Sequence, residues 1–180
     1  MTSLALGRPI RVSLLLALAF ALTACGFHLR RNADLPASMQ RVHLAISGGS
    51  NFQRQLARAL ENAGVTLEDD AGPGIAEFKV PTADFNTDTL TSGGYARISE
   101  YAIHYTVRFS VTDDAGQLLV PPQSLNMSRE YSYDASNTVG NAAQVEQIQK
   151  SLDDDMVQAI MFRLQAAAAH AAPASATSTR

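Results

Sequence analysis

The residue with the most distinctive chemistry in this chain is its only cysteine, Cys25. Its thiol cannot form a disulfide within the chain, so it is a nucleophile, a point of covalent attachment or a residue without a chemical role. Cys25 follows an apolar run, residues 12–22 (VSLLLALAFAL), which is itself preceded by Arg8 and Arg11. A basic start and an apolar run of roughly 7–15 residues are typical of a signal peptide. The run is shorter than the roughly 20 residues that a transmembrane helix needs.

The residues around Cys25 indicate the type of signal. Leu22, Thr23, Ala24 and Cys25 resemble a bacterial lipobox, in which the thiol receives a diacylglyceryl group and the new amine is acylated after cleavage. We therefore predict a signal peptide over residues 1–24 and a lipid anchor at Cys25, since two or more acyl chains give stable membrane attachment. Gly26 replaces the aspartate typical of inner-membrane lipoproteins, which predicts the periplasmic face of the outer membrane. A core helix with a buried cysteine is the alternative.

No other residues form a pattern typical of catalysis or metal binding, so we expect no enzyme activity, no metal and no cofactor. The histidines are scattered, without metal-ligand spacing: His28, His43, His104 and His170. The stretch ISGGSNF (46–52) lacks a phosphate-binding fingerprint and favours a tight turn with a helix cap. Three adjacent acids, residues 153–155, cannot face one ion from a helix, and we interpret them as a solvated acidic face.

Basic residues near a predicted hairpin are the remaining candidates for ligand contact. Arginine binds phosphate well because its planar guanidinium can donate two parallel hydrogen bonds. Scattered surface charge is the simpler interpretation, because folded surfaces mix both signs. The formal charge of −3 argues against a nucleic-acid partner. The four residues concerned are Lys79, Arg97, Arg108 and Arg129.

The pattern of apolar residues predicts the elements that must position these side chains. Strands are expected at 41–47, 65–68, 75–89, 101–111 and 125–133, where apolar residues alternate with polar ones. Pro81 interrupts the third of these and indicates an edge position or a bulge. Helices are expected at 51–63, with Ser50 and Gln53 as a capping box and Gly64 as the stop, and from Asn141, with Gln144 as its partner, to about residue 167.

These elements predict an α+β fold in which two amphipathic helices pack on one face of a mostly antiparallel sheet, in the order β-α-β-β-β-α. Residues 41–167 form the single domain, 25–40 a lipidated tether and 168–180 a disordered tail. The opposite face of the sheet carries His104, Thr106 and Arg108 and is either solvated or in contact with a partner.

Several stretches of the sequence resemble the LptE family of lipopolysaccharide-assembly lipoproteins. The mature chain begins CGFHLRR (25–31), with a proline at 36. LARALENAGV (56–65) is similar to the family's first helix, and RISEYAIHYTVRFSV (97–111) to its central strand. The resemblance covers most of the mature chain.

The resemblance implies a non-enzymatic outer-membrane lipoprotein that plugs the β-barrel protein LptD, binds lipopolysaccharide and assists its assembly at the cell surface. In that family the lipid contacts are basic residues near strand tips, so Arg97 and Arg129 are the candidate lipopolysaccharide contacts here. Two alternatives stay open: a scaffold lipoprotein of another envelope assembly machine, and a lipid-anchored periplasmic hydrolase.

Overall fold

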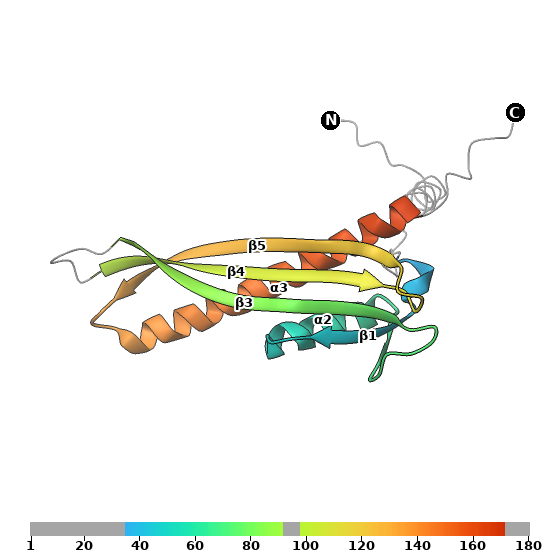
Figure 1. The fold of residues 1–180 in the computed structure, drawn as a ribbon. Coiled ribbons are helices and arrows are strands. Elements are labelled where there is room, and N and C mark those ends of the chain that lie inside the picture. Colours follow the sequence, from blue (N-terminus) through green and yellow to red (C-terminus); the bar gives the residue numbers. More distant parts are fainter. Residues whose placement is uncertain (1–34, 92–97, 172–180) are drawn as a thin grey trace, which may run out of the picture. The chain divides into compact units, whose positions relative to one another are not determined.

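Five strands form one sheet in the order β2-β1-β3-β4-β5, and two helices lie behind it in the view of Figure 1. The computed structural model describes residues 35–91 and 98–171, which belong to the unit Asn32–Arg180. The bounds of the elements are as follows: a 3-10 helix η1 (Ala37–Met39), β1 (Arg41–Ile46), α2 (Ser50–Asn62), β2 (Thr66–Glu68), β3 (Ala76–Thr91), β4 (Ile98–Thr112), β5 (Leu118–Asp134) and α3 (Thr138–Ala171). The predicted α+β class and element order are confirmed.

The N-terminal half is built around a parallel β1-α2-β2 crossover. β1 pairs in parallel with both β2 and β3. Gly48 and Gly49 have positive φ angles of 86° and 64°, and the turn that they form leads directly into α2. The predicted capping box is wrong, because Gly49 is the N-cap and Ser50 already belongs to the helix. Gly64, with φ of 90°, follows the last helical residues as predicted, since glycine tolerates this conformation.

Strand β3 changes its buried face at Pro81. Ala76, Phe78 and Val80 are buried before the proline, and Ala83 is buried after it. The register with β4 shifts between Lys79 and Thr82, so the strand carries a bulge with one extra residue. The predicted irregularity at Pro81 is therefore confirmed as a bulge.

Strand β4 follows the predicted alternation closely. Its odd-numbered residues from 103 to 111 are buried, and they face the helices in one core cluster. β5 starts seven residues before the predicted position and contains Pro121 and Pro122, next to another register shift. Both prolines fall inside this register shift of an edge strand, and bulges and edge strands are the places where a sheet tolerates proline.

Helix α3 is longer than predicted at both ends. Its 34 residues span about 51 Å. It starts at Thr138 rather than Asn141, and Asn137 supplies the cap, since the side-chain Oδ1 of Asn137 accepts a hydrogen bond from the N–H of Gly140 at 3.1 Å. It ends at Ala171, so the first four residues of the predicted tail are helical, and residues 172–180 lie outside the described residues. The predicted apolar stripe is confirmed, with Leu152, Met156 and Ile160 in the core.

Candidate functional site

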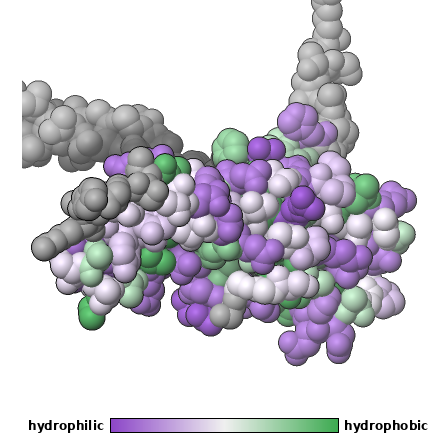
Figure 2. Space-filling model, turned by 60° about the vertical axis from the view of Figure 1, so that its left-hand side comes forward, coloured by the Kyte–Doolittle hydropathy of each residue, from purple (hydrophilic) through white to green (hydrophobic). Residues whose placement is uncertain are grey.

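The face of the sheet turned away from the helices is polar. His104 of β4 lies 3.3 Å from Asp88 of β3, and Asn86 donates a hydrogen bond to Asp88 at 3.0 Å. Thr106 donates to Asn126 of β5 at 2.8 Å. The sheet face that was predicted to be polar therefore carries short polar contacts between its side chains. On the side of the molecule seen in Figure 2, apolar patches are small and separated by hydrophilic residues.

Arg108 also lies exposed on β4 and has no ion-pair partner among the described residues. Lys79, the other candidate base on this part of the sheet, pairs with Glu77 at 2.8 Å. The two are consistent with the interpretation that surface charges of both signs are mixed here.

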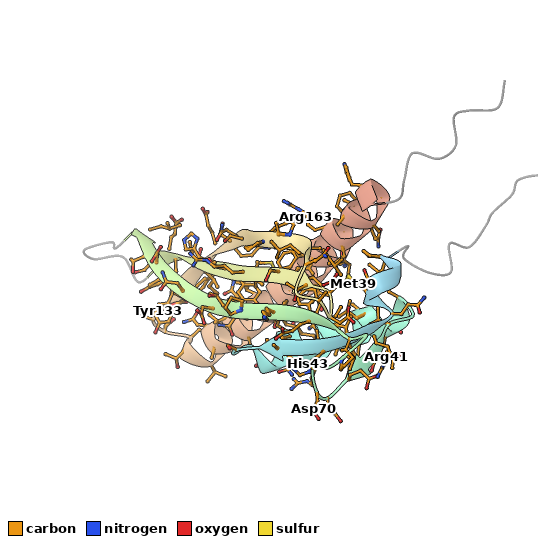
Figure 3. The ribbon with its side chains drawn as sticks, turned by 45° about the vertical axis from the view of Figure 1, so that its right-hand side comes forward. Met39, Arg41, His43, Asp70, Tyr133 and Arg163 are labelled. Atoms are coloured by element: carbon orange, nitrogen blue, oxygen red, sulfur yellow. The ribbon has the colours of Figure 1, made fainter. Side chains whose placement is uncertain are left out.

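The opposite face carries an aromatic group at the far end of the sheet. Tyr101 stacks on Tyr131 with ring centroids 5.5 Å apart, and Tyr133 meets Tyr101 edge-on at 5.8 Å. Figure 3 shows Tyr133 at the end of the molecule opposite Met39. Tyr131, Tyr133 and the first turns of α3 line a shallow cavity of about 370 Å³. Partial burial raises the pKa of Tyr131, and Tyr101 and Tyr133 add to the effect.

The start of α3 is fastened to the end of β5 by a buried asparagine. The side-chain amide of Asn141 donates to the carbonyl oxygen of Asp134 at 2.7 Å, and its Oδ1 accepts from the N–H of Asp134 at 3.2 Å. The Asp134 carboxylate in turn accepts hydrogen bonds from the Oγ–H and N–H of Ser136. These hydrogen bonds hold the pKa of the Asp134 carboxyl below its ordinary value.

Arg129, one of the two predicted lipopolysaccharide contacts, lies on β5 and pairs with Asp155 of α3. Its Nη2 lies 2.7 Å from Oδ2 of Asp155, and the two side chains are 53% and 41% exposed. Arg129 belongs to the helix-facing set of β5 residues, since it stands opposite the buried Ile103 of β4. Arg97 and Cys25, the other predicted site residues, lie outside the described residues.

The predicted acidic face at residues 153–155 is wrong for its first member. Asp153 is only 4% exposed, and its Oδ2 accepts a hydrogen bond from Asn51 of α2 at 2.7 Å. Burial raises the pKa of the Tyr105 hydroxyl well above its ordinary value, and the charge of Asp153 raises it further. The sequence signal for this burial was weak: Asp153 stands four residues before Val157, which is also buried.

A larger cavity of about 640 Å³ is lined in part by the hydrogen-bonded pair Asn51 and Asp153. It lies where the start of α2, the middle of α3 and strand β3 meet. Phe85 forms part of its wall, and one ring face of Phe85 stacks on Tyr105 at 3.9 Å. The polar residues that line it are Asn51, Arg54, Glu146, Gln147, Gln149, Lys150 and Asp153.

The His104–Asp88 pair lies on an open strand face, with side chains 44% and 57% exposed, and it lines none of the cavities described above. His43, by contrast, contacts the carbonyl oxygen of Glu68 at 3.1 Å. Among residues 35–91 and 98–171, no group of three acidic, histidine or cysteine side chains could hold a metal ion. No helix in the same ranges is long and apolar enough to cross a membrane.

Comparison with known proteins gives a family and a set of similar folds. Residues 39–164 match the family model described as LptE, Lipopolysaccharide-assembly. This stretch contains all five strands, α2 and most of α3.

Three solved structures share the fold. Lipoprotein B of Nitrosomonas europaea matches with a TM-score of 0.64 and 23% identity, over 82% of this chain and 94% of its own. A minor lipoprotein of Acinetobacter baumannii matches with a TM-score of 0.59 and 22% identity, over 71% and 92%. Rare lipoprotein B of Shewanella oneidensis matches with a TM-score of 0.58 and 19% identity, over 72% and 95%.

Proposed function

Because this chain belongs to the LptE family of lipopolysaccharide-assembly proteins, we propose that it is an outer-membrane lipoprotein that plugs the LptD barrel. In this role it binds lipopolysaccharide and assists its assembly at the cell surface. The protein works by binding and scaffolding, without catalysing a reaction. The observation that carries the proposal is the family match, which spans nearly the whole described fold.

The polar face of the sheet supports the proposal that the protein occupies the barrel lumen. The lumen of a membrane β-barrel is polar and water-lined, so a protein that occupies it needs satisfied polar contacts more than a large apolar patch. The row formed by Asp88, His104, Thr106 and Asn126 has this character. The small size of the apolar patches in Figure 2 agrees with it.

Lipopolysaccharide carries phosphates, which suit guanidinium donors. We place the candidate contacts at Arg97, which directly precedes β4, and at Arg129. Arg129 uses Nη2 to bind Asp155, and its half-exposed guanidinium retains other N–H donors for a phosphate.

Co-purification tests the partner. Extracts of membranes in mild detergent should yield the protein together with a large β-barrel, at constant stoichiometry through size-exclusion chromatography. A strictly monomeric protein under the same conditions would contradict the proposed role as a plug of the barrel. Depletion separates this function from that of a scaffold in another envelope machine: lipopolysaccharide should leave the cell surface while other barrels assemble normally.

The lipid anchor is tested by Cys25→Ala. The variant should fold but lose its own attachment to the membrane, and a fraction should remain in the membrane through the barrel. Radiolabelled palmitate should be incorporated into the wild-type protein and not into the variant. Complete release of the variant into the soluble fraction would contradict a tight plug.

A further inference from the structure

Strand β3 extends beyond the end of its neighbour β1. The second half of β3 is therefore a free edge, although β3 is the middle strand of the sheet. β1 pairs with β3 only as far as Ile46 opposite Val80, and the N–H of Ser47 donates to the carbonyl oxygen of Val80 at 2.9 Å. The chain then turns away through Gly48 and Gly49 into α2. In Figure 1, β3 continues to the left past the end of β1. Among the described residues, β3 beyond Val80 has a partner strand only on the β4 side.

The main-chain groups at this edge follow from the alternation of a strand. The carbonyl of Val80 points toward β1, and the bulge adds one residue before Thr82 pairs with Arg108. The N–H and C=O of every second residue therefore point away from β4, beginning at Ala83. A Cβ at Gly48 would lie 3.7 Å from the carbonyl oxygen of Ala83, so the turn occupies that first position. Phe85, Thr87 and Thr89 are left with N–H and C=O groups at the open edge.

The cavity of about 640 Å³ lies along the same edge. Phe85 lines it from β3, and α2 and α3 form its other walls. A chain paired with Phe85 and Thr87 would direct every second side chain to the helix side of the sheet, where this cavity lies. The amides of Gln147 and Gln149 and the cations of Arg54 and Lys150 offer such a side chain polar contacts.

We propose that this open edge is a binding slot for an extended segment of a partner protein, which adds a strand beside β3. Unpaired N–H and C=O groups that repeat every second residue, about 6.6 Å apart, match the spacing of another strand. The other long free edge, on β5, carries prolines only near its start, at Pro121 and Pro122, and it therefore serves as the comparison edge in the test below. β3 carries no proline past Pro81. Assigning the segment to the barrel partner rests on the proposed function, whereas the slot does not.

A proline at Thr87 separates strand addition from other binding modes. Thr87→Pro removes an N–H that points away from β4, and edge positions of this kind accept proline without loss of the fold. Thr87→Ala keeps the N–H and serves as the matched control. Ser128→Pro places the same change on the outer edge of β5, where Ser128 is exposed. Circular dichroism and thermal melting check that each variant is folded.

The probe is a phage-displayed library of random 12-residue peptides, selected against the full-length lipidated protein in detergent. Selected peptides should bind the wild type, Thr87→Ala and Ser128→Pro alike. They should bind Thr87→Pro about tenfold or more weakly, because a main-chain hydrogen bond is lost and the peptide carbonyl is left without a donor. Hydrogen exchange needs no variant: bound peptide should slow exchange of the Phe85, Thr87 and Thr89 amides.

The proposal fails if no peptide is selected, if Thr87→Pro binds as well as the wild type, or if Ser128→Pro is the variant that loses binding. A dimer of this chain that Thr87→Pro disrupts would assign the edge to a second copy and overturn the partner segment. Peptide binding that depends on Thr87 in a protein that co-purifies with no barrel would refute the proposed function and leave the slot intact. A barrel complex that forms equally well with Thr87→Pro, together with peptide binding that does not depend on Thr87, would support the proposed function and refute the slot.

Discussion

Asn141→Ala tests whether α3 is held to the sheet by its first turn. Asn141 is 6% exposed and makes two hydrogen bonds to the main chain of Asp134, at 2.7 and 3.2 Å. Alanine removes both and leaves the N–H of Asp134 without a partner, while the C=O of Asp134 keeps the main-chain N–H of Asn137 as a donor at 3.0 Å. Each lost bond costs about 0.5–1.5 kcal/mol, and the unsatisfied N–H moves the total toward the upper end, so we expect a loss of about 2–3 kcal/mol.

Urea unfolding of the full-length chain measures this loss. The midpoint should fall by about 1 M for a slope of about 1–3 kcal/mol/M, with the slope itself unchanged. The melting temperature should drop by about 4–12 °C, at roughly 2–4 °C per kcal/mol for a chain of this size.

Asn137→Ala is the matched control, because Asn137 stands one turn earlier and makes one exposed hydrogen bond to the N–H of Gly140. Loss of such a cap costs about 1 kcal/mol. If Asn141→Ala destabilises the protein no more than Asn137→Ala, the buried amide does not fasten the helix and the reasoning is refuted.

Three further predictions concern charged groups. In a double-mutant cycle, Arg129→Ala and Asp155→Ala should show a coupling of about 0.2–1 kcal/mol in urea unfolding, because the pair is half-exposed; a coupling above about 2 kcal/mol would contradict a surface pair. Ser136→Ala should raise the pKa of the Asp134 carboxyl part of the way toward its ordinary value in an NMR titration, since it removes the hydroxyl hydrogen bond that lowers this pKa most and keeps the one from the main-chain N–H. In the wild type, the stabilisation from this carboxylate is present above the ordinary pKa of aspartate and is lost as the pH falls through the lowered one; an unchanged titration in the variant would refute the assignment. Asp153→Ala should destabilise the protein by about 1–3 kcal/mol, because it leaves the side-chain amide of Asn51 on α2 unpaired. The control Asp154→Ala, at an exposed position, should change stability by less than about 0.5 kcal/mol.

The sequence was most informative where one face of an element is buried. Alternation along β4 predicted the buried set from Ile103 to Val111 because a strand has a period of two residues. The stripe of α3 was visible for the same reason at helical spacing. Arg129 shares the helix-facing side of β5 with Met127 and Tyr131, and this charge has its partner on α3. The partner itself could not be predicted, because Asp155 lies 26 residues away and is brought close only by the packing of α3.

Element ends were harder to predict, because competing local signals exist there. Asn141 and Gln144 have the spacing of a capping box, but Asn137 caps the helix and Asn141 binds the strand. Both asparagines suit a helix start, and the choice depends on the position of Asp134. β5 was predicted to start only after Pro121 and Pro122, and the strand includes them because they lie at a register shift of an edge strand.

The far end of the sheet differs from the rest in how it is supported. β3, β4 and β5 continue past the end of β1, and Phe52 of α2 packs edge-on against Tyr105 of β4 near the start of this extension. Farther along, α3 contacts the strands through partly buried apolar residues such as Val145 and through two polar contacts, Asn141 with Asp134 and Arg129 with Asp155. Segments held by few buried apolar contacts open at lower free energy than the core. A partner strand on β3 would add main-chain hydrogen bonds where this support is weakest, and it would therefore stabilise the end of the molecule on which Tyr101, Tyr131 and Tyr133 also lie.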